Sequence, residues 1–119
     1  MRRMERDAAF RAYDPQRTLE HWHYVRSSEM RNIIPYINTT DYVVNSALPY
    51  ELPIMRSRLF HHFEAWVEAY ADDPLRQDAF MRAERVYGLL KAVTSVEDDA
   101  AIPPDSLLRE FIGGSCYEY

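Results

Sequence analysis

The 119-residue sequence has only three glycines, one cysteine and one lysine, and it has no long apolar run. With so few glycines it can contain neither a Gly-x-x-x-x-Gly-Lys-Ser/Thr phosphate loop nor a Gly-x-Gly-x-x-Gly nucleotide motif. The single cysteine, Cys116, excludes an internal disulfide and suits a reducing compartment. Neither a signal peptide nor a membrane span of eighteen apolar residues can be recognised. We therefore expect a soluble, cytoplasmic protein that is not a complete catalyst by itself.

The net charge of -5 argues against general nucleic-acid binding, which normally needs a basic face. The charge is unevenly distributed, because residues 1–31 carry seven arginines and five acids (7 − 5 = +2). Residues 95–119 carry one arginine and six acids (1 − 6 = −5). Arginine is suited to bidentate binding of phosphate or carboxylate, although genomic base composition can also favour it.

The chain has the length of one domain, and we divide residues 1–119 into four parts. Residues 1–36 predict two helices, 2–12 and 15–34, and Asp14 and Pro15 give the second a cap and a first turn. Residues 41–46 are β-branched and aromatic and predict a short strand. Residues 51–94 predict a helical hairpin. Residues 95–119 predict short helices and a tail, and the last of these helices, from Ser106 to Ile112, is ended by Gly113 and Gly114.

The hairpin prediction rests on two apolar stripes with helical spacing. The first stripe consists of Leu59, Phe63, Trp66, Val67 and Tyr70. The second consists of Phe80, Ala83, Val86, Tyr87, Leu90 and Val93. Asp73 and Pro74, between the stripes, mark a turn and the start of the second helix. The fold class expected is therefore mainly α, with an αα-hairpin and one or two short β-strands.

A lone strand at residues 41–46 needs a partner, since an isolated strand leaves its own backbone groups unpaired. That partner is an element not recognised in the sequence, another chain, or a sheet outside this sequence. We expect the isolated chain to form a homodimer that covers this strand or the apolar surface beside it.

The usual metal-ligating and nucleophilic residues are poorly arranged for chemistry. His21 and His23 are two apart and point in opposite directions on a helix, and His61 and His62 are adjacent, so neither pair can chelate one metal. Cys116 has no neighbouring base that would activate its thiol. The sequence therefore predicts no metal site and no catalytic residue.

An arginine cluster near the N-terminus is the exception, with Arg2, Arg3, Arg6 and Arg11 within ten residues. The spacing of Arg3, Arg6 and Asp7 places these three on one helical face. Like charges three or four residues apart destabilise a helix, so concentrating them makes sense if something anionic approaches. The alternative is a solvated surface that Glu5 and Asp7 partly balance. The spacing alone favours neither interpretation.

Further residues resemble a known family. The run Arg3-Met4-Glu5-Arg6-Asp7 with Phe10-Arg11-Ala12-Tyr13 resembles the Arg-x-x-Arg-Asp…Arg-Gly segment of the phosphoribulokinase/uridine kinase family. Residues 18–36 and the string Asn45-Ser46-Ala47-Leu48-Pro49-Tyr50-Glu51-Leu52 extend the match. Residues 2–55 resemble the C-terminal part of longer, bacterial uridine-kinase-like proteins, and the hairpin does so more loosely.

The resemblance implies the C-terminal piece of a P-loop α/β kinase, which transfers the γ-phosphoryl group of ATP to a hydroxyl. Arg3, Arg6 and Arg11 would be phosphate-facing lid residues, and Asp7 would orient one of them by an ion pair. Residues 41–46 would be an edge strand of the P-loop sheet. Ala12 departs from the family, which has glycine there.

The family's P-loop, its metal-binding acid and its main substrate pocket precede the matched segment, so ATP and Mg²⁺ belong to the full-length family. For this chain alone we expect no cofactor, and activity only with a P-loop kinase half in cis or in trans. The alternative is a non-catalytic helical domain for self-association or protein interaction. Under both interpretations we expect neither nucleic acid nor a membrane as a partner.

Overall fold

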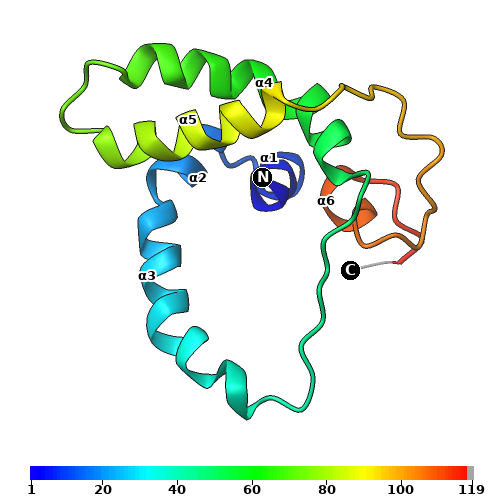
Figure 1. The fold of residues 1–119 in the computed structure, drawn as a ribbon. Helices are drawn as coiled ribbons and strands as arrows, with labels where there is room; N and C mark the ends of the chain where they lie inside the picture. Colours follow the sequence, from blue (N-terminus) through cyan, green and yellow to red (C-terminus); the bar gives the residue numbers. More distant parts are fainter. Residues whose placement is uncertain (118–119) are drawn as a thin grey trace.

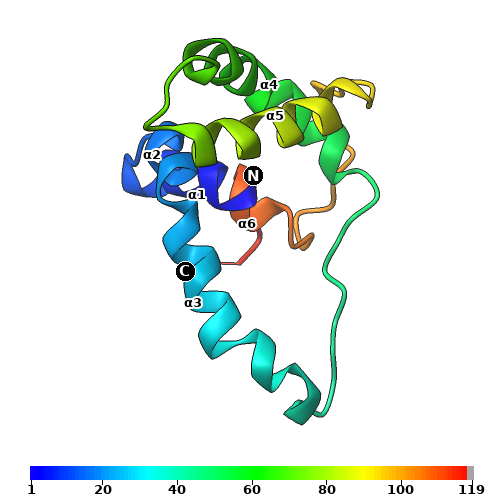
Figure 2. The ribbon, with the colours of Figure 1, turned by 60° about the vertical axis from the view of Figure 1, so that its left-hand side comes forward.

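The computed structural model describes residues 1–117 and is mainly helical (Figure 1). Its elements are, in chain order, α1 (Arg2–Arg11), α2 (Pro15–Glu20), α3 (Trp22–Asn32), the 3-10 helix η1 (Ile34–Thr39), α4 (Glu51–Tyr70), α5 (Gln77–Lys91) and α6 (Arg109–Ile112). Helices α4 and α5 lie side by side in both views and run in opposite directions (Figures 1 and 2). The predicted mainly α fold and its αα-hairpin are confirmed.

The core follows the two predicted stripes. Buried side chains of α4 pack on small residues of α5, among them Ala79 and Ala83, which let the two helices approach closely. Met4 of α1, Leu19 of α2 and Leu108 join the same core. The buried positions of α4 are Ile54, Met55, Leu59, Phe63, Trp66 and Tyr70. Burial of an apolar stripe, rather than helix propensity, therefore stabilises the hairpin.

A side chain of α4 closes the open end of the hairpin. The Arg56 guanidinium donates to the carbonyl oxygens of Leu90, at 2.9 Å, and Lys91, at 3.0 Å, and also to that of Val93. The last carbonyls of a helix have no partners inside the helix and carry its negative dipole end. Arg56 therefore caps α5 and ties it to α4.

Charged contacts attach α1 and the C-terminal segment to the hairpin. Arg2 of α1 donates Nε and Nη2 to the two carboxylate oxygens of Glu51, at 2.7 and 2.6 Å. Arg58 of α4 pairs with Glu5 at 3.3 Å and with Asp99 at 2.9 Å, and Asp99 also accepts from Arg109 at 3.0 Å. Bidentate and shared pairs of this kind have more defined geometry than single surface contacts.

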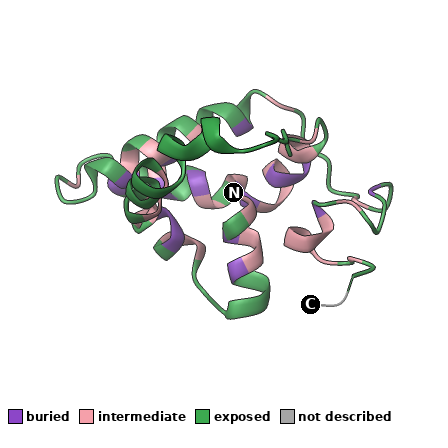
Figure 3. Ribbon diagram, turned by 90° about the horizontal axis from the view of Figure 1, so that it is seen from below, coloured by how far each residue is buried: buried purple, intermediate pink, exposed green. Residues whose placement is uncertain are grey.

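Residues 22–48, which we call the arm, leave this body. Helix α3 runs away from the hairpin, η1 forms the tip, and an extended segment returns to α4 (Figures 1 and 2). No residue of the arm is buried, and it is almost entirely exposed, in contrast to the helices at the centre of the molecule (Figure 3).

The predicted strand at residues 41–46 is wrong. This segment is extended, but residues 1–117 contain no β-strand. Tyr42, Val43 and Val44 favour extended backbone, yet a strand also needs the hydrogen bonds of a neighbour, and none lies beside the arm.

Helix boundaries differ from the expected ones at three places. The single helix predicted for residues 15–34 breaks at His21, whose backbone N–H and ring Nδ1 both bond the Arg17 carbonyl oxygen. The second hairpin helix begins at Gln77, because residues 74–76 form a turn after Asp73. The last helix covers only Arg109–Ile112 and ends, as predicted, at Gly113, which has a φ of 93°. No helix in the described part of the chain is long and apolar enough to cross a membrane.

Candidate functional site

The predicted lid residues lie together on α1 around one carboxylate. Asp7 accepts from Arg3 Nε at 3.1 Å on Oδ2, and from Arg6 Nε at 3.1 Å and Nη2 at 3.0 Å on Oδ1. Arg11 Nη1 lies 3.6 Å from the same Oδ1. Positions 3, 7 and 11 are four apart, so helical periodicity brings them to one face. The resemblance implied that Asp7 orients one arginine, whereas it pairs with three.

Asp7 is buried, with 4 % of its surface exposed, although it is charged. Burial opposes its ionisation, but the hydrogen bonds from Arg6 and Arg3, together with their charges, outweigh burial and lower the pKa of Asp7 below its ordinary value. The carboxylate is thus ionised at neutral pH and acts as a fixed anchor for the guanidinium groups.

The three arginines keep part of their donor surface available. Their side chains are 44 %, 35 % and 62 % exposed for Arg3, Arg6 and Arg11, against 5 % for Asp7. Arg3 bonds Asp7 through Nε, and Arg6 bonds it through Nε and Nη2, so within residues 1–117 terminal N–H groups of both arginines have no hydrogen-bond acceptor. Three guanidinium groups around one carboxylate leave a local charge of about +2.

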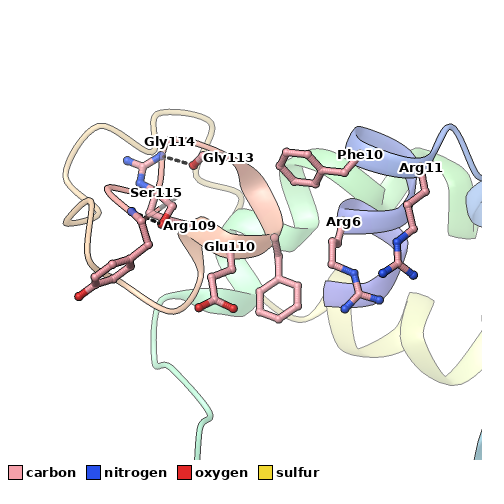
Figure 4. Close-up of a pocket in the computed structure, with 10 residues that line it drawn as sticks. Arg6, Phe10, Arg11, Arg109, Glu110, Gly113, Gly114 and Ser115 are labelled. Atoms are coloured by element: carbon pink, nitrogen blue, oxygen red, sulfur yellow. Dashed lines mark hydrogen bonds between the residues drawn. The ribbon is translucent and has the colours of Figure 1, made fainter. Parts of the chain in front are cut away.

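A hollow of about 640 Å³ adjoins this cluster, between α1 and the C-terminal segment. In Figure 4, Arg6 and Arg11 stand on one side with Phe10, and the α6 helix and the Gly113–Ser115 turn stand opposite. Phe111 and Tyr117 add aromatic lining. Its volume is in the range of small-molecule sites, which combine apolar walls with a few polar groups.

A smaller hollow of about 240 Å³ lies on another side of the cluster, bounded by α1, α2 and α3. Arg3, Asp7 and Arg11 line it together with Thr18 and His21. The Thr18 hydroxyl oxygen is buried and has no hydrogen-bond partner among the described residues. Arg11 lines both hollows.

The fourth arginine of the cluster has a structural role instead. Arg2 is engaged by Glu51 and Ser46, and its guanidinium lies 5.5 Å from the centre of the Phe111 ring. The hydrogen bond to Glu51 and its negative charge raise the pKa of Arg2 despite the opposing effect of burial. Arg2 therefore joins α1, α4 and α6 rather than facing a ligand.

The backbone leaves α1 through Ala12, which has a φ of 49° and is the only described non-glycine residue with a positive φ. This left-handed conformation brings the Tyr13 N–H to the Asp7 carbonyl oxygen at 3.0 Å. Glycine adopts it without the steric cost that alanine bears. Ala12 thus occupies a position where the turn needs a glycine-like conformation.

Sequence reasoning missed the C-terminal wall of the larger hollow. In the sequence, Gly113 and Gly114 indicate only the end of a helix, and no pattern marks Arg109 or Phe111. Arg109 is tied to Asp99 and to the Ile102 carbonyl oxygen, which fixes this wall in place. No periodic or spacing signal links α1 to α6, because their contact spans about a hundred positions of sequence.

Of the four histidines and Cys116, only His21 is among the described residues that line either hollow. The His62 ring stacks on Trp66 with 5.3 Å between ring centres, and Cys116 is exposed. No group of three or more His, Cys, Asp or Glu side chains in residues 1–117 could hold a metal ion.

Comparison with known proteins gives no relative: no family model, no curated protein and no solved structure matches this chain.

Proposed function

We propose that this chain is the lid and helical module of an ATP-dependent phosphotransferase of the phosphoribulokinase/uridine kinase type. In this proposal it acts with a P-loop half, in cis or in trans, and is inactive alone. Support comes from the Arg3-x-x-Arg6-Asp7 and Asn45–Leu52 sequence motifs. The observation that carries the proposal is the convergence of Arg3, Arg6 and Arg11 on buried Asp7.

The physical argument concerns charge and preorganisation. Transfer of a γ-phosphoryl group involves little covalent chemistry for the protein, so positioning and neutralising charge supply most of the catalysis. Arginines already oriented by Asp7 lose less freedom when they bind a phosphate, and their exposed N–H groups are the donors required.

The extended segment at residues 41–46 would pair with the edge of the P-loop half's sheet. Tyr42, Val43 and Val44 are 89 %, 71 % and 83 % exposed, and their backbone groups have no strand partner in residues 1–117. An added strand would satisfy those groups and cover these side chains.

Mg²⁺ would come with the other half, because the described residues offer no fitting group of ligands. Under this proposal the chain works in the cytoplasm, where ATP is available.

The test is complementation with a P-loop half from a kinase of the same family, joined to residue 1 or mixed with the chain. We expect ATP-dependent phosphoryl transfer with both parts present and none with either alone. Arg6→Ala should lower kcat by about 10²–10³, the usual loss for one transition-state charge contact. Arg26→Ala is the matched control, since Arg26 pairs only with Glu29, on α3, and should leave kcat unchanged. Equal rates for the two variants would overturn the proposal.

A second candidate is self-association without catalysis, favoured by the apolar surface of the arm. At the tip, Ile33, Tyr36 and Ile37 are 61 %, 60 % and 43 % exposed, and the bare segment at residues 41–46 follows. Apolar side chains gathered in this way typically mark an interface, and a second copy would cover them in a homodimer.

Light scattering discriminates the two candidates. Self-association predicts a nucleotide-independent dimer that Val44→Lys converts to a monomer. Leu75→Lys is its control, because Leu75 is equally exposed but lies in the loop between α4 and α5, outside the arm. A monomer at all concentrations would rule out the second candidate and leave the first untouched.

A further inference from the structure

We infer that the smaller hollow between α1, α2 and α3 binds a phosphoryl oxyanion, with the Thr18 hydroxyl as a ligand beside Arg3 and Arg11. We expect the isolated chain to bind this anion by itself. Only the natural source of the phosphoryl group rests on the proposed function.

The size and the charge of the hollow select the ligand class. Its volume of about 240 Å³ is below the range of roughly 300–1,000 Å³ typical of drug-sized ligands, so a small ion fits better than a whole nucleotide. Arg3 and Arg11 line this hollow together with the single carboxylate of Asp7, and that carboxylate already accepts hydrogen bonds from Arg3 and from Arg6. The site is therefore cationic where an anion would enter.

The lining combines polar donors with apolar side chains. Tyr13, Trp22 and Val25 lie beside the charged groups. The donors Arg3 and Arg11 belong to α1 and the donor Thr18 belongs to α2, so they can surround a tetrahedral oxyanion rather than meet it from one side.

Thr18 is the unexplained group. Its residue is 5 % exposed, and its backbone N–H bonds the Asp14 carbonyl oxygen at 3.3 Å, but its hydroxyl has no partner in residues 1–117. A buried threonine in a helix commonly bonds a carbonyl one turn earlier, and leaving a hydroxyl unpaired destabilises the fold. An oxyanion in the hollow that Thr18 lines would accept this hydrogen bond after a rotation of the side chain about χ1.

The experiment titrates the full chain with inorganic phosphate at an ionic strength held constant with NaCl. Binding is followed by fluorescence, because Trp22 lines the hollow, and by the shift in Tm. We expect saturable binding, a Kd about tenfold higher in Thr18→Val, and a Kd within about twofold of wild type in Thr18→Ser, which keeps the hydroxyl. Arg26→Gln should bind like wild type. Without phosphate, Thr18→Val should melt a few degrees higher than wild type, because the unpaired hydroxyl is gone.

Equal phosphate affinity in wild type and Thr18→Val would overturn the inference, as would a lower Tm of Thr18→Val without phosphate, which would mean that the hydroxyl has a partner. A parallel titration with ATP identifies the source. If Thr18→Val weakens ATP binding equally, the terminal phosphoryl of a nucleotide enters the hollow; if only phosphate binding changes, the free ion does. Failed complementation with intact phosphate binding would reject the kinase proposal alone.

Discussion

The body and the arm of this protein are built from similar residues but held by very different means. In the body, apolar stripes of α4 and α5 are buried, and arginine–carboxylate pairs such as Arg2–Glu51 and Arg58–Asp99 attach the flanking segments. In the arm, apolar side chains such as Ile33 and Val43 are exposed. Apolar composition alone thus does not stabilise a segment, because what matters is whether a second surface covers it.

The two regions also divide the proposed roles. The arginine cluster belongs to α1, which the body holds through Arg2 and Glu5, so its geometry is fixed in the isolated chain. The arm exposes its apolar side chains. Under the proposed function, the arginine cluster would bind the anion and the arm would contact the other half.

The sharpest test of the contrast compares two aromatic truncations. Phe63→Ala should lower the free energy of unfolding by about 4 kcal/mol, because the fully buried ring leaves a cavity in the core. Tyr42→Ala should change it by less than about 0.5 kcal/mol, because its ring is 89 % exposed. Urea unfolding measures both. A large loss in Tyr42→Ala would mean that the arm is packed in solution, against the body or against a second copy.

The next largest effect on stability is expected at the buried phenol of Tyr70, in the body. Burial, then the hydrogen bond to Glu20 and its negative charge, raise the pKa of Tyr70 from 10.0 to about 12. A raised pKa in the folded state gives stability that is complete below pH 10 and is lost as pH rises towards 12, by roughly 2–3 kcal/mol. The Tyr70→Phe variant should not lose this stability between pH 10 and pH 12. Unfolding of both proteins between pH 9 and 12 measures it, and parallel pH profiles would contradict the burial of Tyr70.

A somewhat smaller loss of folding stability is expected when the arginine cluster loses its shared carboxylate. Asp7→Ala removes the shared partner of Arg3, Arg6 and Arg11 and should destabilise by about 2 kcal/mol, since the exposure of the arginines limits the cost. The exposed Asp105→Ala serves as control, with less than about 0.5 kcal/mol expected.

The acid dependence gives Asp7 a second readout. The pKa of Asp7 is lowered in the folded state. Its contribution to the free energy of unfolding is therefore complete above the ordinary aspartate pKa of about 4, and it disappears as the pH falls through the pKa of the folded state. Chemical unfolding from pH 7 to pH 3 should therefore narrow the difference in stability between wild type and Asp7→Ala as the pH falls. A constant difference would show that Asp7 acts by packing rather than by charge.

The sequence predicted the body better than the arm. Leu59, Phe63 and Tyr70 carry a helical period that marks the buried face directly, and all three are buried. At residues 41–46 the same kind of reasoning gave a strand, because local preference for extended backbone was visible but the missing neighbour was not. The break at His21 was missed for a related reason, since it depends on a side-chain contact with the Arg17 carbonyl oxygen.

In the candidate site, too, the sequence predicted local spacing but not contacts between helices. Spacing predicted that Arg3, Arg6 and Asp7 share one helical face, and in the structure Arg3 and Arg6 both bond the Asp7 carboxylate. The burial of Asp7, the unpaired Thr18 hydroxyl and the aromatic wall at Phe111 depend on how α1 packs against α2 and α6, which no local pattern encodes.

The smallest predicted effect has the opposite sign and concerns the turn after α1. Ala12 has a φ of 49°, a conformation that costs alanine roughly 1–2 kcal/mol, so Ala12→Gly should stabilise the chain by about 0.5–1 kcal/mol after the added chain entropy of glycine is deducted. Ala9→Gly, in the helical and exposed part of α1, should destabilise it by about 1 kcal/mol. Thermal unfolding of the two variants should therefore move Tm in opposite directions. If both substitutions lower Tm, the left-handed turn that positions Arg11 beside Asp7 is absent in solution.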